Sequence, residues 1–183
     1  MKINISRIII FSFVIFCLFV FWLGLKKNIN YDTKSLIGSR ISNFQLIEIN
    51  NTDQLISEKD LKNNKFTLIN FFASWCAPCR TEHKYLLKLS NKKIKILGVN
   101  FKDKRSNANK FLQELGNPYD FVTKDSDGKA SVLFGVYGIP ESILIDNNLI
   151  VIKKIIGPIG QSQYNEILNL LKWKLKKLFL LFI

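Results

Sequence analysis

The chain combines one long apolar stretch near its start with a series of shorter apolar segments separated by polar turns. Residues 8–25 are almost entirely apolar and carry no charged side chain. A stretch of this length can span the hydrocarbon core of a bilayer, near the lower limit. Residues 26–35 are polar and show no periodicity. The pattern therefore predicts an anchor within residues 1–25, a tether over 26–35, and one folded domain from residue 36.

The shorter segments alternate between strand and helix patterns. Segments 66–72 and 94–101 are dense in branched and aromatic residues, as in buried strands. Segment 161–177 places its apolar residues on one helical stripe. Along the chain, these patterns predict strands at 44–49, 66–72, 94–101, 121–122, 142–145 and 150–156, and helices at 57–61, 80–90, 106–115, 130–134 and 161–177.

The order of these elements indicates the fold class. Strand, helix, strand, helix, then a hairpin and a final helix is typical of an α/β domain. We expect a central mixed sheet that begins with parallel pairs and ends with an antiparallel hairpin, flanked by helices on both faces. About 150 residues follow the tether, which is enough for one domain with a core of its own.

The apolar stretch at the start has two possible interpretations. A cleaved signal peptide would end in a small-x-small site, whereas Phe21-Trp22-Leu23-Gly24-Leu25 is bulky, so a retained transmembrane helix is favoured. Lys2 and Arg7 precede the stretch and two lysines follow it, so charge does not fix its orientation. Cys17 lies within the stretch, where we expect it to be inert.

The chain is basic, with 27 Lys and Arg against 14 Asp and Glu and a net charge of +13. Such a charge can attract nucleic acid or anionic membranes. The cations are nearly all lysines scattered along the chain, and no nucleic-acid motif accompanies them, so nucleic-acid binding is not expected. The tail, residues 178–183, is apolar but too short to span a membrane. It either extends the last helix over the core or dips into a lipid surface.

The segment Cys76-Ala77-Pro78-Cys79 is the candidate site of dithiol–disulfide exchange. The motif lies where the predicted strand 66–72 ends and a helix begins. A helix start presents unpaired N–H groups and the positive end of the helix dipole, which favour a thiolate. We expect Cys76 to be the attacking thiolate and Cys79 to resolve the mixed disulfide. A membrane-tethered dithiol domain fits the oxidising side of a membrane, where disulfides form.

Two other interpretations of the cysteine pair are weaker. A zinc site helped by His83, the single histidine, has at most three local ligands, and the remaining cysteine lies in the apolar stretch. A static disulfide between residues three apart would constrain little of the unfolded chain. We therefore expect no metal and no cofactor. A peroxidase is also disfavoured, since no Pro-x-x-x-Thr-x-x-Cys pattern surrounds Cys76.

Over about residues 36–171 the chain resembles the membrane-anchored, thioredoxin-like thiol:disulfide interchange proteins of bacterial cytochrome c maturation, the CcmG/DsbE family. The resemblance rests on four segments, which are Asn70-Phe71-Phe72-Ala73-Ser74-Trp75-Cys76-Ala77-Pro78-Cys79-Arg80 with Glu82-His83, Gly98-Val99-Asn100-Phe101-Lys102-Asp103, Leu115-Gly116-Asn117-Pro118-Tyr119, and Gly135-Val136-Tyr137-Gly138-Ile139-Pro140-Glu141. The resemblance implies a thioredoxin-like fold over residues 36–177. One departure is Lys84, which stands where the family usually has a proline that kinks the helix.

The resemblance also implies roles for individual residues. Pro140 matches the cis-proline that lies against the cysteines, and Ile139 beside it would bind an extended substrate through its backbone. Glu82 and Glu141 match the acidic residues that distinguish the family. If these two carboxylates lie near the dithiol, they would raise the pKa of a cysteine thiol and transfer protons. The alternative is that both are ordinary carboxylates in contact with solvent. Trp75, Pro78 and Tyr137 are expected to line the same substrate groove, although Tyr137 is equally compatible with a core position.

The implied partners follow from the family. The substrate would be apocytochrome c or its thiol partner, reduced before haem attachment, and the electron donor a membrane protein of the DsbD or CcdA type. The implied location is the bacterial inner membrane, crossed once, with the domain in the periplasm. Two other functions stay open: a general extracytoplasmic reductase of the TlpA or ResA kind, and a module that holds apocytochrome without redox chemistry.

Overall fold

A computed structural model describes residues 5–25, 36–62, 64–92 and 94–180. The chain forms two compact units, Met1–Asp32 and Thr33–Ile183. In the first, helix α1 (Ile5–Leu25) exposes every side chain and has a mean hydropathy of 2.9 over its most apolar window. It is long and apolar enough to cross a membrane, as its sequence predicts. The predicted tether lies outside the described residues.

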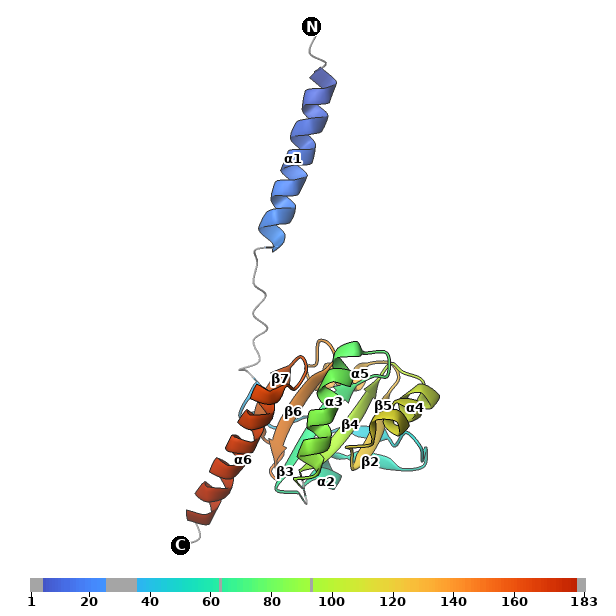
Figure 1. The fold of residues 1–183 in the computed structure, drawn as a ribbon, viewed down its shortest axis with the longest axis vertical. Coiled ribbons are helices and arrows are strands. Elements are labelled where there is room, and N and C mark those ends of the chain that lie inside the picture. Colours follow the sequence, from blue (N-terminus) through green and yellow to red (C-terminus); the bar gives the residue numbers. More distant parts are fainter. Residues whose placement is uncertain (1–4, 26–35, 63, 93, 181–183) are drawn as a thin grey trace. The chain divides into compact units, whose positions relative to one another are not determined.

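The second unit is built on a five-stranded mixed sheet of order β5-β4-β3-β6-β7 (Figure 1). Strands β3 (Phe66–Phe72), β4 (Lys95–Phe101) and β5 (Phe121–Asp125) are parallel. Strand β6 (Glu141–Asp146) runs antiparallel to β3, and β7 (Val151–Ile156) forms a hairpin with β6. This confirms the predicted sheet of parallel pairs followed by an antiparallel hairpin. Burial on both faces explains why β3 and β4 are mostly apolar, without a strict alternation of polar residues.

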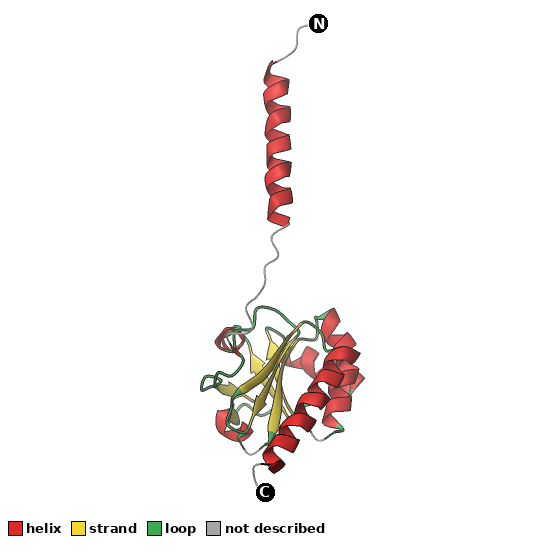
Figure 2. Cartoon of the chain, turned by 90° about the vertical axis from the view of Figure 1, so that its left-hand side faces the viewer, coloured by secondary structure: helices red, strands yellow, loops and turns green. Residues whose placement is uncertain are grey.

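Layers cover both faces of the sheet (Figure 2). Helices α3 (Ala77–Ser90), α4 (Arg105–Leu115) and α6 (Gln161–Leu180) each bury apolar residues, Ile167 and Leu171 in the case of α6, against the face of Leu68 and Phe72. The short helix α5 (Lys129–Leu133), helix α2 (Glu58–Leu61) and a two-stranded sheet of β1 (Gln45–Ile47) and β2 (Leu55–Ser57) cover the face of Ile69 and Phe71. The two cores thus lie on opposite sides of one sheet.

Some element limits differ from the sequence prediction. Helix α3 begins at Ala77 rather than residue 80, because Pro78 fits in the first turn, where its missing N–H has no partner to lose. Strand β2 was not predicted and β5 is longer than predicted, since these short segments become strands by pairing with β1 and β4 and not through an apolar pattern of their own. Helix α6 continues to Leu180 rather than residue 177, and residues 181–183 lie outside the described residues.

Candidate active site

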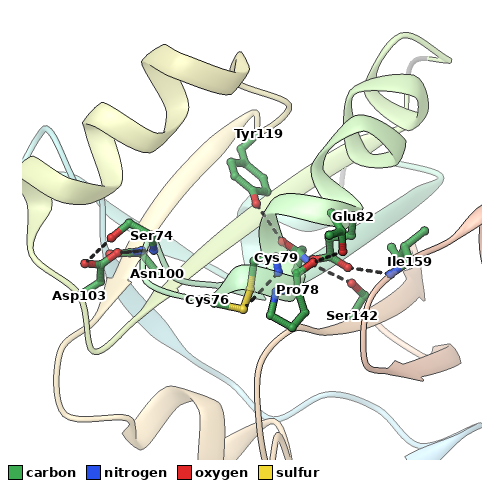
Figure 3. The surroundings of a disulfide bond; sticks show 12 residues. Ser74, Cys76, Pro78, Cys79, Glu82, Asn100, Asp103, Tyr119, Ser142 and Ile159 are labelled. Atoms are coloured by element: carbon green, nitrogen blue, oxygen red, sulfur yellow. Dashed lines mark hydrogen bonds between the residues drawn. A yellow bond between two sulfur atoms is a disulfide. The ribbon is translucent and has the colours of Figure 1, made fainter.

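The two cysteines of the predicted motif are joined at the start of helix α3 (Figure 3). Their sulfurs are 2.07 Å apart, and both residues are buried, Cys76 with 4 % and Cys79 with 1 % of its surface exposed. Cys76 is the N-cap of α3, and its Sγ accepts a hydrogen bond from the backbone N–H of Cys79 at 3.2 Å. A sulfur in this position is stabilised as a thiolate by the helix start when the disulfide is reduced.

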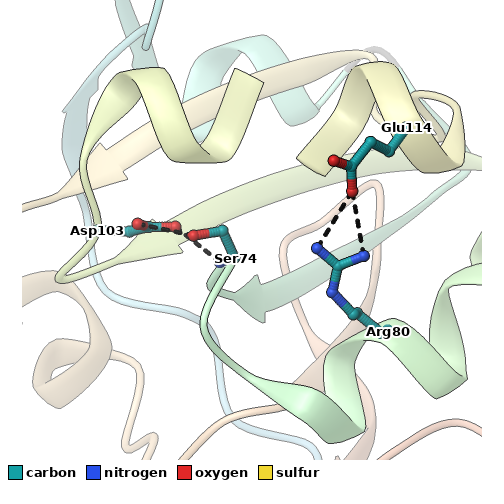
Figure 4. A network of polar contacts seen from close by, with 4 residues as sticks. All are labelled: Ser74, Arg80, Asp103 and Glu114. Atoms are coloured by element: carbon teal, nitrogen blue, oxygen red, sulfur yellow. Dashed lines mark hydrogen bonds and ion pairs between the residues drawn. The ribbon is translucent and has the colours of Figure 1, made fainter. Parts of the chain in front are cut away.

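A turn after strand β4 holds the segment just before the cysteines (Figure 4). The Asp103 carboxylate accepts hydrogen bonds from the Ser74 backbone N–H at 2.7 Å and from the Ser74 hydroxyl at 3.0 Å. The Lys102 carbonyl accepts a hydrogen bond from Trp75 Nε1 at 3.3 Å, and Lys102 itself lies in the left-handed region with φ 42°. Trp75 remains 59 % exposed. The turn therefore fixes a large aromatic side chain on the surface beside Cys76.

Glu82 is fully buried one turn of α3 beyond Cys79 (Figure 3). Its Oε1 accepts a hydrogen bond from Asn70 Nδ2 at 2.9 Å, and its Oε2 accepts one from the Ile159 backbone N–H at 2.8 Å. Burial raises the pKa of Glu82 to about 7, and these two hydrogen bonds oppose the rise because they favour the carboxylate. A carboxyl group that titrates near neutral pH can both accept and release a proton there.

Tyr119 orients the Asn70 amide that contacts Glu82. The Tyr119 hydroxyl donates to Asn70 Oδ1 at 2.8 Å, so the Asn70 amino group faces Glu82. The Tyr119 ring stacks on Phe72 with centroids 4.8 Å apart, and it occupies the space that a side chain at Gly98 would need. Burial, and then the charge of Glu82, raise the pKa of Tyr119 well above its ordinary value, so the hydroxyl stays a donor.

His83 packs inside the domain, next to Glu82 in sequence. Its Nε2 is 2.8 Å from the Gly116 carbonyl, and its ring meets Phe111 edge-on with centroids 5.0 Å apart. Burial lowers the pKa of His83, so the ring is neutral at pH 7. No group of three or more His, Cys, Asp or Glu side chains with metal-ligand spacing occurs among the described residues.

The loop before strand β6 lies beside the end of β3. The Ile139–Pro140 bond is cis. Glu141 pairs with Phe71, one residue before the end of β3, so Pro140 lies next to the segment that leads to the cysteines. Pro140 is buried and Ile139 half-buried, whereas Tyr137 is 73 % exposed and does not fill the core. The loop thus adds a second exposed aromatic residue to this end of the sheet.

Glu141 is buried, but on the other face of the sheet from Glu82. Strand β6 alternates its side chains, so Ser142 bonds Asn70 beside Glu82 while Glu141 points to the opposite core. There it pairs with Lys154 and accepts hydrogen bonds from loop amides. The two carboxylates that sequence analysis treated alike therefore have different surroundings.

Three residues of this region were not recognised from the sequence. Asp103 and Tyr119 appeared only within the segments that carry the family resemblance, and Lys154 appeared only within the predicted strand 150–156. Lys153 and Lys154 are adjacent in a strand, and adjacent strand residues face opposite sides. Because both faces of the sheet were predicted to be covered, each of these lysines was expected to face a covering layer, but the sequence did not indicate which of them is buried.

Comparison with known proteins agrees with this geometry. The Redoxin family model matches residues 36–168. The chain is 39 % identical over 132 residues to the thiol:disulfide interchange protein DsbE of Escherichia coli, covering 72 % of this chain and 71 % of that one. It is 34 % identical over 175 residues to DsbE of Yersinia pestis, covering 91 % and 93 %, and 48 % identical over 95 residues to CycY of Rhizobium leguminosarum, covering 51 % of each chain.

Solved structures with the same fold include two redox proteins. The thioredoxin domain of a thiol-disulfide oxidoreductase from Bacteroides vulgatus matches with a TM-score of 0.62 and 25 % identity, covering 73 % of this chain and 96 % of that one. A thiol:disulfide interchange protein from a Bacteroides species matches with a TM-score of 0.61 and 25 % identity, covering 72 % and 87 %.

Proposed function

The chain belongs to the Redoxin family as a thiol:disulfide oxidoreductase of the DsbE type, and on this premise we propose that it reduces the disulfide of apocytochrome c, or of its maturation partner, before haem attachment. The observation that carries the proposal is the Cys76–Cys79 pair at a helix start, with the titrating carboxyl group of Glu82 one helical turn away and two exposed aromatic side chains at this end of the sheet. A thiol:disulfide interchange protein acts on partners that contain thiols or disulfides. What we propose beyond this is the identity of the partner, apocytochrome c or its maturation partner.

The reaction is a two-step disulfide exchange. In the reduced protein, the Cys76 thiolate attacks one sulfur of the substrate disulfide, and the other substrate sulfur leaves as a thiolate. Cys79 then loses its proton and attacks Cys76 Sγ, which breaks the mixed disulfide and releases the second substrate sulfur as a thiolate. The substrate gains two electrons and the protein is left with its Cys76–Cys79 disulfide. A membrane dithiol donor of the DsbD or CcdA type restores the two thiols.

Glu82 has the position and chemistry of the proton acceptor for Cys79. Cys79 and Glu82 are three residues apart on α3, which places them on the same face of the helix (Figure 3). Because Cys79 is enclosed, its proton needs a local acceptor in the resolving step. A carboxyl group with a pKa of about 7 can take that proton at neutral pH and return it afterwards.

The substrate would be bound by the surface around Cys76. Exposed Trp75 and Tyr137 supply apolar contacts from two sides, and Pro78 lies exposed in the first turn of α3. Ile139 would bind an extended peptide through its backbone, because Pro140 has no N–H with which to continue the sheet. A haem-binding Cys-x-x-Cys-His segment is a short extended disulfide substrate of this kind.

Helix α1 would hold the protein in the bacterial inner membrane as a single pass, with the domain in the periplasm. We propose that residues 1–25 form the cytoplasmic end and anchor, 26–35 the tether, 36–177 the thioredoxin-like domain and 178–183 an apolar tail. Reduction of a secreted cytochrome requires the domain to face the compartment in which disulfides form.

Trapping the mixed disulfide tests the proposal. Reduced Cys79→Ser protein is mixed with an oxidised Cys-x-x-Cys-His peptide, and adducts are measured by mass spectrometry. We expect a one-to-one adduct through Cys76 that dithiothreitol releases, and none with Cys76→Ser. Adduct formation with insulin but not with this peptide would contradict the substrate and indicate a general reductase. Cytochrome c assembly that survives replacement of both cysteines by serine would indicate a holding module instead.

A further inference from the structure

Lys154 is a buried cation on a mostly apolar face of the sheet. It lies on β7 opposite Ile143, and its side chain has 0 % of its surface exposed. The apolar side chains on this face include those of Ile143, Ile145 and Val151, all of which belong to the core under α5. Burying an ammonium group lowers stability unless charged or polar partners compensate it, so the partners of Lys154 indicate what it does at this position.

The partners of Lys154 lie on both sides of Pro140, with Gly135 and Tyr137 before it and Glu141 directly after it. Its Nζ lies 2.9 Å from Glu141 Oε2, donates a hydrogen bond to the Gly135 carbonyl, and lies over the Tyr137 ring, 5.2 Å from its centroid. The other oxygen of Glu141, Oε1, accepts hydrogen bonds from the backbone N–H groups of Tyr137 at 3.0 Å and Gly138 at 3.1 Å.

One ion pair therefore holds three backbone groups of the loop from inside the domain. The loop, defined here as residues 135–140, carries exposed Tyr137 and ends at Pro140, next to the segment that leads to the cysteines. Glycines at 135 and 138 leave its backbone free to take other conformations. Hydrogen bonds from the loop backbone to the charged groups of Lys154 and Glu141 are stronger than hydrogen bonds between neutral groups. These bonds can therefore hold the loop in a single conformation.

We propose that Lys154 is a positioning residue for the recognition of protein disulfides, acting through Glu141 to fix the loop 135–140 in its substrate-binding conformation. The proposal rests on the assigned disulfide exchange at Cys76. A peptide substrate contacts the loop while it reacts, whereas a small dithiol reaches the sulfurs without it. Loss of the ion pair should therefore raise KM for a peptide disulfide much more than it slows reaction with a small dithiol.

The test uses the full chain in detergent and the variant Lys154→Met, which keeps a straight side chain and removes the charge. Initial rates with an oxidised Cys-x-x-Cys-His peptide give kcat and KM when excess reduced glutathione returns the protein to its dithiol state and the uncatalysed rate is subtracted. Stopped-flow reduction of the oxidised protein by dithiothreitol gives the small-dithiol rate constant. In Lys154→Met, we expect kcat/KM for the peptide to fall at least tenfold more than the rate constant for dithiothreitol. The fall should come from a rise in KM and not from a lower kcat. Lys153→Met, which removes an adjacent lysine paired with Glu166 on α6, is the matched control and should change neither.

A second variant covers the case in which Lys154→Met does not fold, because that change leaves Glu141 buried without its cation. The double variant Glu141→Gln/Lys154→Met is neutral and keeps a side-chain oxygen for the loop amides. It should fold and show the same selective rise in KM. Equal losses with the peptide and dithiothreitol, or an unchanged KM in a folded variant, would overturn the proposal. If the wild-type protein ignores the peptide but reduces insulin, the proposed substrate fails, and the same comparison with insulin still tests Lys154.

Discussion

At the scale of single residues, the surroundings of a side chain decide its chemistry more than its type does. From the sequence, Glu82 and Glu141 were equivalent candidates for proton transfer or for solvated surface positions. The structure buries both, one beneath the cysteines with neutral partners and the other in an ion pair with Lys154. The cysteine pair and the cis-proline were predictable because they lie in short motifs. Lys154 was not identified because lysine is rarely buried and its partner is distant in sequence.

The raised pKa of Glu82 predicts how stability varies with pH. Between about pH 4.5 and about pH 7 the folded protein keeps a proton on Glu82 that the unfolded chain has lost, so the free energy of unfolding falls as the pH rises through this range. A shift from 4.5 to about 7 corresponds to roughly 3 kcal/mol. Urea unfolding of the oxidised protein at several pH values should show this loss in the wild type and not in Glu82→Gln.

Glu114→Gln is the control for this experiment, because Glu114 is an exposed carboxylate on α4 that pairs with Arg80 at 3.3 Å. It should leave the pH dependence as in the wild type. Parallel pH profiles for the wild type and Glu82→Gln would mean that Glu82 titrates alike in the folded and unfolded states, and the proton-transfer role would lose its basis.

At the scale of elements, apolar runs located the strands of the central sheet, and their order gave its topology. Strands β3 and β4 were placed nearly to the residue because both faces of each are buried. Strand β2 was missed because its three residues become a strand only by pairing with β1. The start of α3 was placed too late, since Pro78 was not recognised as a residue of the first turn.

The contact between Gly98 on β4 and Tyr119 before β5 yields a prediction at this scale. A Cβ at Gly98 would lie 2.8 Å from Tyr119 Cγ, so the ring has to move away from Phe72 and Asn70. Gly98→Ala should lower the free energy of unfolding by about 1–3 kcal/mol, as overpacking does. Urea denaturation checks this, with Gly138→Ala as control, because no atom lies within 4 Å of a Cβ at that position. Equal stabilities of the two variants would show that Tyr119 is not held as described.

At the scale of the whole molecule, the chain combines a helix able to cross a membrane with a thioredoxin-like domain that presents a dithiol site. Charge around the helix did not reveal its orientation, because basic residues flank both ends. The redox site supplies the argument instead, since substrate disulfides form on the outer side of the membrane. Both the proposed function and the proposed orientation therefore depend on electrons flowing from the Cys76–Cys79 dithiol to substrate disulfides.

The reduction potential of the Cys76–Cys79 pair tests that direction most directly. The full chain in detergent is equilibrated with dithiothreitol or glutathione redox buffers, and its free thiols are alkylated and counted by mass spectrometry. A protein that delivers electrons to substrate disulfides should have a potential at or below about −220 mV, in the range of glutaredoxins and thioredoxin. A potential near about −120 mV, as in DsbA, would mean that the pair accepts electrons and would contradict the account.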